Sequence, residues 1–127
     1  MSIKRIYYIA LNVPAGTGTP KEPYGTNGNQ NFPPLKLPKG NIKKIYPVFP
    51  SGASELLFAQ LVDANNNIIY PTGSNQGGFI NLTSTANLAV EVDWSVTQTD
   101  NFVNVNAYNL DTTNAHEVIF GIEMELI

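Results

Sequence analysis

The sequence contains no cysteine, and among its 127 residues there is one histidine, one tryptophan and one arginine. Without cysteine the chain can form neither a disulfide framework nor a thiolate metal site. Charged residues make up 13% of the chain, whereas roughly 25% is usual for globular proteins. The polar surface must therefore consist largely of uncharged side chains, among which asparagine is prominent. Such a surface stays hydrated and repels similar surfaces only weakly.

Long hydrophobic runs are absent as well. No stretch approaches the roughly 20 apolar residues of a membrane-spanning helix, so we expect no membrane span. The apolar run near the start contains Tyr7, Tyr8 and Asn12 and lacks a small-residue cleavage site, so it predicts a strand and not a signal peptide. The length of 127 residues predicts a single domain, residues 1–127.

Alternation of apolar and polar residues is the strongest positive signal. Residues 117–126 place Val118, Phe120, Ile122 and Met124 on one face, and glutamate recurs on the other. The same pattern recurs at 88–94, where Trp94 falls on the inward face, and at 101–109, where the predicted outward residues are Asn104, Asn106 and Tyr108. Residues 3–11 and 54–62 are apolar on both faces, which predicts strands that are covered on both sides or lie in an interface.

Residues 41–50 form another strand-like run, but it contains Pro47, which cannot donate to a sheet ladder and so predicts an edge or bulged strand. We count seven to nine strands separated by turn residues, and no convincing helix. This pattern predicts an all-β fold, a two-sheet antiparallel sandwich of the jelly-roll or a related Greek-key type.

A long irregular segment, residues 13–40, interrupts the strand pattern near the start. Loops longer than about 15 residues are usually functional or disordered in compact domains. We expect an arm that contacts neighbouring subunits, because its prolines reduce the entropy lost on binding. The alternative is an ordered loop folded back over its own sandwich. The residues predicted for the interface are Tyr24, Phe32, Leu35, Leu37, Lys43 and Lys44.

Charge is distributed unevenly along the chain. All seven basic residues lie within the first 44 positions, where Glu22 is the only acid, so this part carries 7 − 1 = +6 and the remainder carries −9. Such asymmetry is typical of a charged partner or a self-complementary surface. The alternative is that the two parts pair within one sandwich.

Residues suited to catalysis are few. His116 follows Asp111 by five residues in a predicted loop, which favours a structural hydrogen bond over a catalytic dyad. The pairs Glu91 with Asp93 and Glu123 with Glu125 each share a strand face, where exposed acids usually serve solvation. We therefore expect no catalytic residues, no cofactor and no enzyme activity.

Ligand-binding motifs are equally weak. Residues 63–67 begin like a calcium loop, but Ile68 and Ser74 occupy the glycine and glutamate positions, so we expect an Asx-rich turn and no metal. Residues 16–25 lack the ending of a phosphate loop. Sparse lysines and a pI near 4.9 argue against a dedicated nucleic-acid binder.

A glycan-binding module is the alternative function. Sandwich lectins present aromatic and amide side chains on one face, and Tyr108, Asn104 and Asn106 match that chemistry. Against it, the single tryptophan, Trp94, falls on the inward face.

Several short elements resemble a known group of proteins. These are residues 37–40, Phe49-Pro50 with Gly52, residues 69–71, and residues 107–109 with Asp111 and His116. Over residues 37–120 the chain resembles small β-sandwich proteins encoded among the virion genes of bacterial and archaeal viruses. The resemblance implies a capsid, decoration or minor capsid protein, found in the virion after assembly in the host cytoplasm. It also implies self-association or contact with other capsid proteins, and it carries no catalytic residues over.

Overall fold

A computed structural model of the protein describes residues 3–25, 35–48, 56–64, 67–71, 78–81, 90–97 and 102–126. Within these ranges the chain forms nine strands and no helix. The strands are β1 (Ile3–Val13), β2 (Leu35–Lys36), β3 (Gly40–Val48), β4 (Leu57–Asp63), β5 (Ile68–Tyr70), β6 (Ile80–Asn81), β7 (Val90–Val96), β8 (Phe102–Asn109) and β9 (His116–Leu126).

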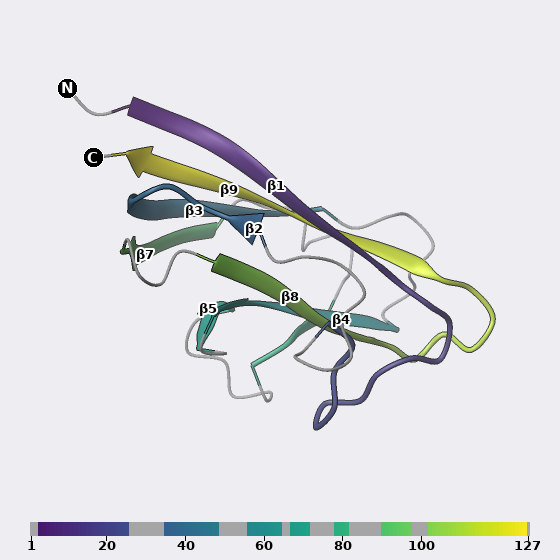
Figure 1. The fold of residues 1–127 in the computed structure, drawn as a ribbon. Coiled ribbons are helices and arrows are strands. Elements are labelled where there is room, and N and C mark those ends of the chain that lie inside the picture. The colour runs from purple at the N-terminus through teal and green to yellow at the C-terminus, as the bar shows by residue number, and fades with distance from the viewer. Residues whose placement is uncertain are drawn as a thin grey trace.

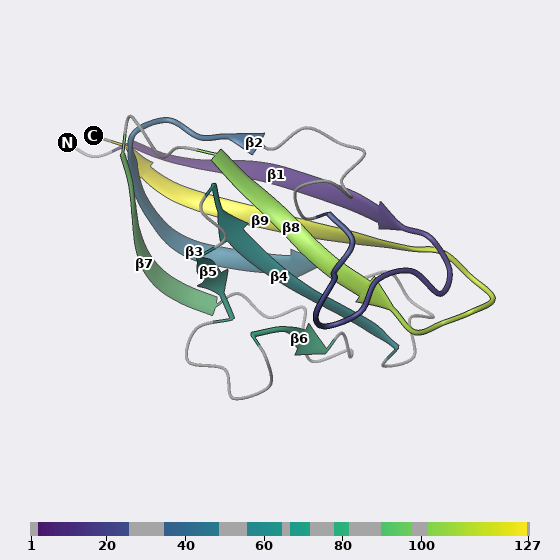
Figure 2. The ribbon, with the colours of Figure 1, turned by 60° about the horizontal axis from the view of Figure 1, so that its bottom comes forward.

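The strands form two antiparallel sheets packed face to face (Figures 1 and 2). The four-stranded sheet has the order β1-β9-β3-β7, and the five-stranded sheet has the order β2-β8-β4-β5, with β6 paired to β4. The predicted all-β, two-sheet antiparallel sandwich is therefore confirmed.

The pairing scheme decides between a jelly roll and other Greek keys. When β6 is left aside, the first strand pairs with the last and each inner pair nests within it: β1 with β9, β2 with β8, β3 with β7, and β4 with β5. This is a single long antiparallel hairpin, which is rolled up by the further pairing of β9 with β3 and of β8 with β4. Eight strands arranged in this way form a jelly roll.

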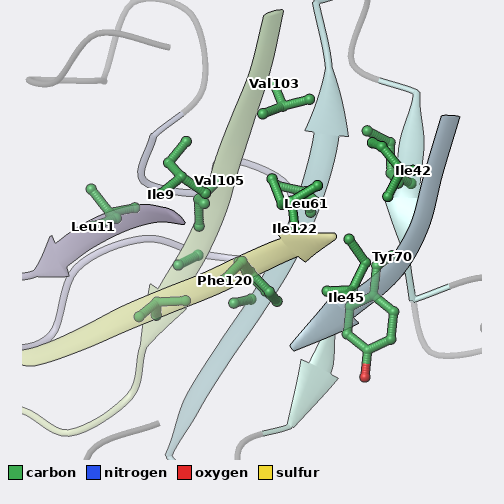
Figure 3. Close-up of a cluster of buried hydrophobic side chains, with 14 of the residues drawn as sticks. Ile9, Leu11, Ile42, Ile45, Leu61, Tyr70, Val103, Val105, Phe120 and Ile122 are labelled. Carbon is green, nitrogen blue, oxygen red and sulfur yellow. The ribbon is translucent and has the colours of Figure 1, made fainter. Parts of the chain in front are cut away.

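The hydrophobic core lies between the two sheets (Figure 3). Phe120 and Ile122 of β9 face Leu61 of β4 and Val105 of β8, and all four side chains are fully buried. The alternation predicted for residues 117–126 is confirmed, because the inward residues of β9 are those that pack into this layer. Trp94 packs against the core from β7, as its inward position predicted.

Strand β3 is bulged, but the predicted alternative of an edge strand is wrong. It lies between β9 and β7, and its register shifts between Ile42 and Lys44. Pro47 is accommodated because the pairing with β7 extends only from Gly40 to Ile45. At Pro47 the register partner is Phe120 of β9, so no ladder bond to β7 is required there.

The described part of the irregular segment runs beside β8 in the antiparallel direction. The carbonyl of Thr17 accepts a hydrogen bond from the Asn109 N–H at 2.8 Å, and Tyr24 exchanges two backbone hydrogen bonds with Ala107 at 2.7 and 2.8 Å. Farther along β8, Leu35 pairs with Val103. The segment thus supplies a discontinuous edge strand.

Two local features explain why this edge strand is discontinuous. Pro20 and Pro23 have no N–H and cannot extend a ladder. Gly25 has a φ of 100° and lies so close to the carbonyl oxygen of Val105 that a side chain would collide with it. Residues 26–34 lie outside the described ranges, and an intersubunit role of the 13–40 segment stays a prediction.

Leu37 tests whether this segment belongs to the folded core. Its side chain is 1% exposed, so Leu37→Ala should lower the free energy of unfolding by about 2 to 5 kcal/mol in urea denaturation. Leu110→Ala is the matched control, because Leu110 is 50% exposed and should change stability by less than about 0.5 kcal/mol. Equal effects of the two substitutions would contradict the packing of Leu37.

Candidate interaction surface

The outer face of the four-stranded sheet carries exposed apolar side chains. Ile6 and Tyr8 of β1 are 47% and 62% exposed, and Val48 of β3 is also exposed. The prediction that residues 3–11 are covered on both sides is therefore wrong, since β1 is an edge strand with a single covered face. Their alternative assignment to an interface stays a prediction. For residues 57–62 the prediction of a strand covered on both sides is confirmed.

Two tyrosines flank a glycine at the centre of this face. A methyl group placed on Gly121 of β9 would lie 3.0 Å from Cε1 of Tyr8 and 3.2 Å from Cβ of Tyr46. The Tyr46 hydroxyl donates to Oε1 of Glu123 at 3.1 Å. Desolvation and this hydrogen bond raise the pKa of Tyr46, so the hydroxyl stays protonated. The absence of a side chain at Gly121 thus leaves room for the Tyr8 ring of β1 and the Tyr46 Cβ of β3 on its two sides.

The bulge in β3 places consecutive lysines, Lys43 and Lys44, where they can reach neighbouring strands. Nζ of Lys43 lies 3.5 Å from Oδ1 of Asp93 in β7. Lys44 has Glu91 of β7 and Glu123 of β9 as its register partners.

On the other side of β9, Lys4 of β1 is the register partner of Glu125. The basic strands β1 and β3 therefore alternate with the acidic strands β9 and β7. This arrangement supports the alternative in which the two oppositely charged parts of the chain pair within one sandwich. Exposed ion pairs of this kind stabilise a fold by about 0–1 kcal/mol each.

The six residues predicted for an interface do not form one continuous surface. Tyr24 and Leu35 are half-buried beside β8, and Leu37 is buried in the protein's own core. Lys43 and Lys44 lie on β3 of the opposite sheet, and Phe32 lies outside the described residues. Their role in an interface stays a prediction. Sequence reasoning did not single out Ile6 and Tyr8, although the two-sided apolar pattern of residues 3–11 contains both.

The outer face of β8 is less exposed than the sequence predicted. Tyr108 points away from the core between the sheets, but it is buried: it stacks on Phe58 at a centroid distance of 4.7 Å and meets Phe79 edge-on at 5.0 Å. The exposure predicted for Tyr108 is wrong because Phe79, from a distant segment, covers it. Alternation identifies the side of a sheet, and it says nothing about what covers that side.

Amide side chains on the same face are also engaged internally. Nδ2 of Asn106 donates to Oε1 of Gln60 at 2.9 Å, and Nε2 of Gln60 donates to the carbonyl of Gly78 at 2.8 Å. Asn106 is buried, so its predicted exposure is wrong, and Asn104 is half-buried. Two of the three side chains considered for glycan binding, Tyr108 and Asn106, are therefore used within the fold.

His116 begins β9 and is buried against the β8–β9 turn. Its Nε2 lies 2.8 Å from Oδ2 of Asp111, while Oδ1 of Asp111 accepts hydrogen bonds from the N–H groups of Thr113 and Asn114. The hydrogen bond from His116, followed by the backbone donors, lowers the pKa of Asp111 to about 2. The Asp111 carbonyl accepts from the Gly16 N–H at 2.8 Å, which ties this turn to the start of the 13–40 segment. The prediction of a structural hydrogen bond for His116 is confirmed.

The predicted Asx-rich turn is also present. The Asp63 carboxylate accepts hydrogen bonds from the backbone N–H and the side-chain Nδ2 of Asn67 at 2.8 and 3.1 Å. Within the described ranges no three acidic or histidine side chains are grouped closely enough to hold a metal ion. The same part of the chain contains no helix long and apolar enough to cross a membrane.

The lowered pKa of Asp111 predicts a pH dependence of stability. Its folded value of about 2 lies below the ordinary value of 3.8, so the stabilisation is present above pH 4 and is lost as the pH falls from about 4 to about 2. The stability difference between the wild type and Asp111→Asn, measured by urea unfolding, should shrink over this range. Asp93→Asn, at an exposed acid, is the control. A difference that does not change with pH would contradict the assignment.

Comparison with known proteins shows a shared fold. No family model matches the sequence, and no curated protein matches it. A solved structure described as "Cyanophage Pam1 capsid asymmetric unit" contains a chain with a similar fold, at a TM-score of 0.60 and 14% sequence identity. The match covers 99% of this chain and 86% of that chain. The protein therefore shares its fold, over nearly its whole length, with a chain of a cyanophage capsid.

Proposed function

We propose that this protein is a non-enzymatic structural component of a virus particle, acting as a capsid, minor capsid or decoration protein. The observation that carries the proposal is the fold it shares, over 99% of its length, with a chain of a cyanophage capsid asymmetric unit. It would be located in the virion after assembly in the host cytoplasm, and would act by self-association or by docking on a shell.

The chemistry of the described residues supports a role in protein–protein contacts. The carboxylate–histidine pair, Asp111 with His116, is committed to a turn that joins β8 to β9. On the outer face of β8, Asn106 is committed to an internal hydrogen bond and Tyr108 to ring stacking. In contrast, the outer face of β1 and β3 leaves large apolar side chains in contact with solvent. Exposed apolar side chains that cluster on one face are typical of protein contact sites.

The test is co-purification with virus particles from the biological source of the chain. Density-gradient sedimentation followed by quantitative mass spectrometry should find this protein in the particle fractions at a constant ratio to the main shell protein. A soluble host protein of similar mass serves as the contamination control. Recovery of this chain in the soluble fractions alone, with none in particles, would overturn the proposal.

A further inference from the structure

Strand β1 is an unusually open edge for a sandwich protein. It pairs with β9 without a register shift from Ile3 to Val13, and it is the last strand of its sheet (Figure 1). Within the described ranges no other strand pairs with it. A long, regular edge strand is a template for pairing with another chain, and proteins usually interrupt such edges with bulges, prolines or charges. No proline or bulge interrupts β1, and its two charged residues, Lys4 and Arg5, lie at one end of the strand, so that residues 6–13 are uncharged.

We propose that β1 is the dimerisation edge of this protein, pairing antiparallel with β1 of a second copy about a two-fold axis at Tyr8. The two four-stranded sheets would then join into one eight-stranded sheet. This inference rests on the proposed function and deepens its self-association part by naming the surface and the partner.

Symmetry and strand length select the axis. A two-fold axis perpendicular to the sheet places the outer faces of the two copies on the same side, so outward residues must pair with outward residues. The numbers of two paired residues therefore add up to an even value, and the axis lies beside one residue that pairs with its own copy. Tyr8 is the midpoint of Ile3–Val13, and an axis there pairs all eleven residues of the strand. An axis one position away shortens the ladder by two residues. On the outer face, this register brings Tyr8 opposite its own copy and Ile6 opposite Ala10 of the second copy.

Charge complementarity selects the same register. Lys4 would lie opposite Asn12 of the second copy, whose β9 neighbour is Glu117. Two strand spacings, about 10 Å between Cα atoms, separate Lys4 from that glutamate, which a lysine and a glutamate can span together. With the axis at Tyr7, Lys4 would instead lie opposite Ala10, beside the apolar Ile119. The basic end of each β1 therefore meets an acidic corner of the other copy when the axis is at Tyr8.

The apolar surface continues across the same axis. Ala10 has Ile119 of β9 as its register partner, so Ile6 of one copy would approach both residues of the other. Ile6 and Tyr8 are 47% and 62% exposed in the single chain, and each would gain a cross-strand neighbour from the second copy. The irregular segment lies on this flank too, since a methyl group on Gly25 would lie 3.3 Å from Cδ2 of Leu11. A partner on β1 would therefore also meet the segment that holds Tyr24.

Cysteine cross-linking tests the axis directly, because the chain has no cysteine of its own. Directly opposite residues of an antiparallel pair have Cα atoms about 4.5 to 5.5 Å apart, which a disulfide can bridge. Oxidised glutathione should therefore convert Tyr8→Cys to a disulfide-linked dimer. Ala10→Cys is the matched control, since its two copies would lie about 14 Å apart. An equal mixture of Ile6→Cys and Ala10→Cys should yield a mixed dimer.

If Tyr8→Cys stays monomeric, or links no more than Ala10→Cys, the axis at Tyr8 is overturned.

Light scattering over a range of concentrations gives a second readout that does not depend on a disulfide. Tyr8→Lys places two like charges at the axis and should raise the dimer dissociation constant more than about tenfold. Ile68→Lys is the control, because Ile68 is an exposed apolar residue of β5 in the opposite sheet, and this substitution should leave the dissociation constant unchanged. Thermal unfolding checks that both variants fold.

The outcomes separate this inference from the proposed function. An oligomer that Tyr8→Lys leaves intact overturns the β1 edge, as does a wild-type protein that is monomeric at every concentration. Neither result bears on co-purification with particles, which a protein that docks on a shell would still show. If the protein is absent from particles but Tyr8→Cys forms a disulfide-linked dimer, the proposed function is overturned and dimerisation through β1 is supported.

Discussion

The structure depends on the antiparallel pairing of the last strand with two earlier ones. Every residue of β1 has a register partner in β9, and β9 also pairs with β3 on its other side. More than a hundred residues separate the paired ends, so the entropy of closing this loop must be offset by the apolar side chains that the pairing buries. Phe120 and Ile122 supply that burial at the centre of the sandwich. Because β9 is central, β1 is left at the edge.

The same roll brings the two oppositely charged parts of the chain together. In a nested hairpin, strands from the first part of the sequence pair with strands from the last, so β1 and β3 alternate with β9 and β7. Lysines early in the sequence thereby come beside glutamates and aspartates that occur late, as Lys43 does with Asp93. Charges that are far apart in sequence are close in space. A low charge density leaves uncharged areas between them, such as the one at Gly121, which has Tyr8 and Tyr46 as its neighbours on the two adjacent strands.

The irregular segment near the start has a structural role in the same scheme. A jelly roll requires a partner along the free edge of β8, and the described parts of this segment provide it at Thr17, Tyr24 and Leu35. Proline and glycine prevent a continuous ladder, so the partner is formed in short pieces. The segment also lies beside β1, because Gly25 is close to the inward-facing side chain of Leu11. Contact within one chain and the contact between copies that we propose therefore share one flank of the molecule.

Alternation of side chains was sufficient to predict the all-β class, the inward face of β9 and the position of Trp94, and the Asp and Asn residues at 63–67 were sufficient to predict the Asx turn. Each of these features depends on neighbours within a few residues. Only the tertiary structure decided which strands are edges and which outer faces are covered. The apolar pattern of residues 3–11 resembles that of residues 57–62, yet β1 is exposed and β4 is buried on both sides. Tyr108 has the pattern of an exposed residue and is covered by Phe79. Local sequence determines the direction of a side chain, whereas its burial depends on segments that only long-range pairing brings together.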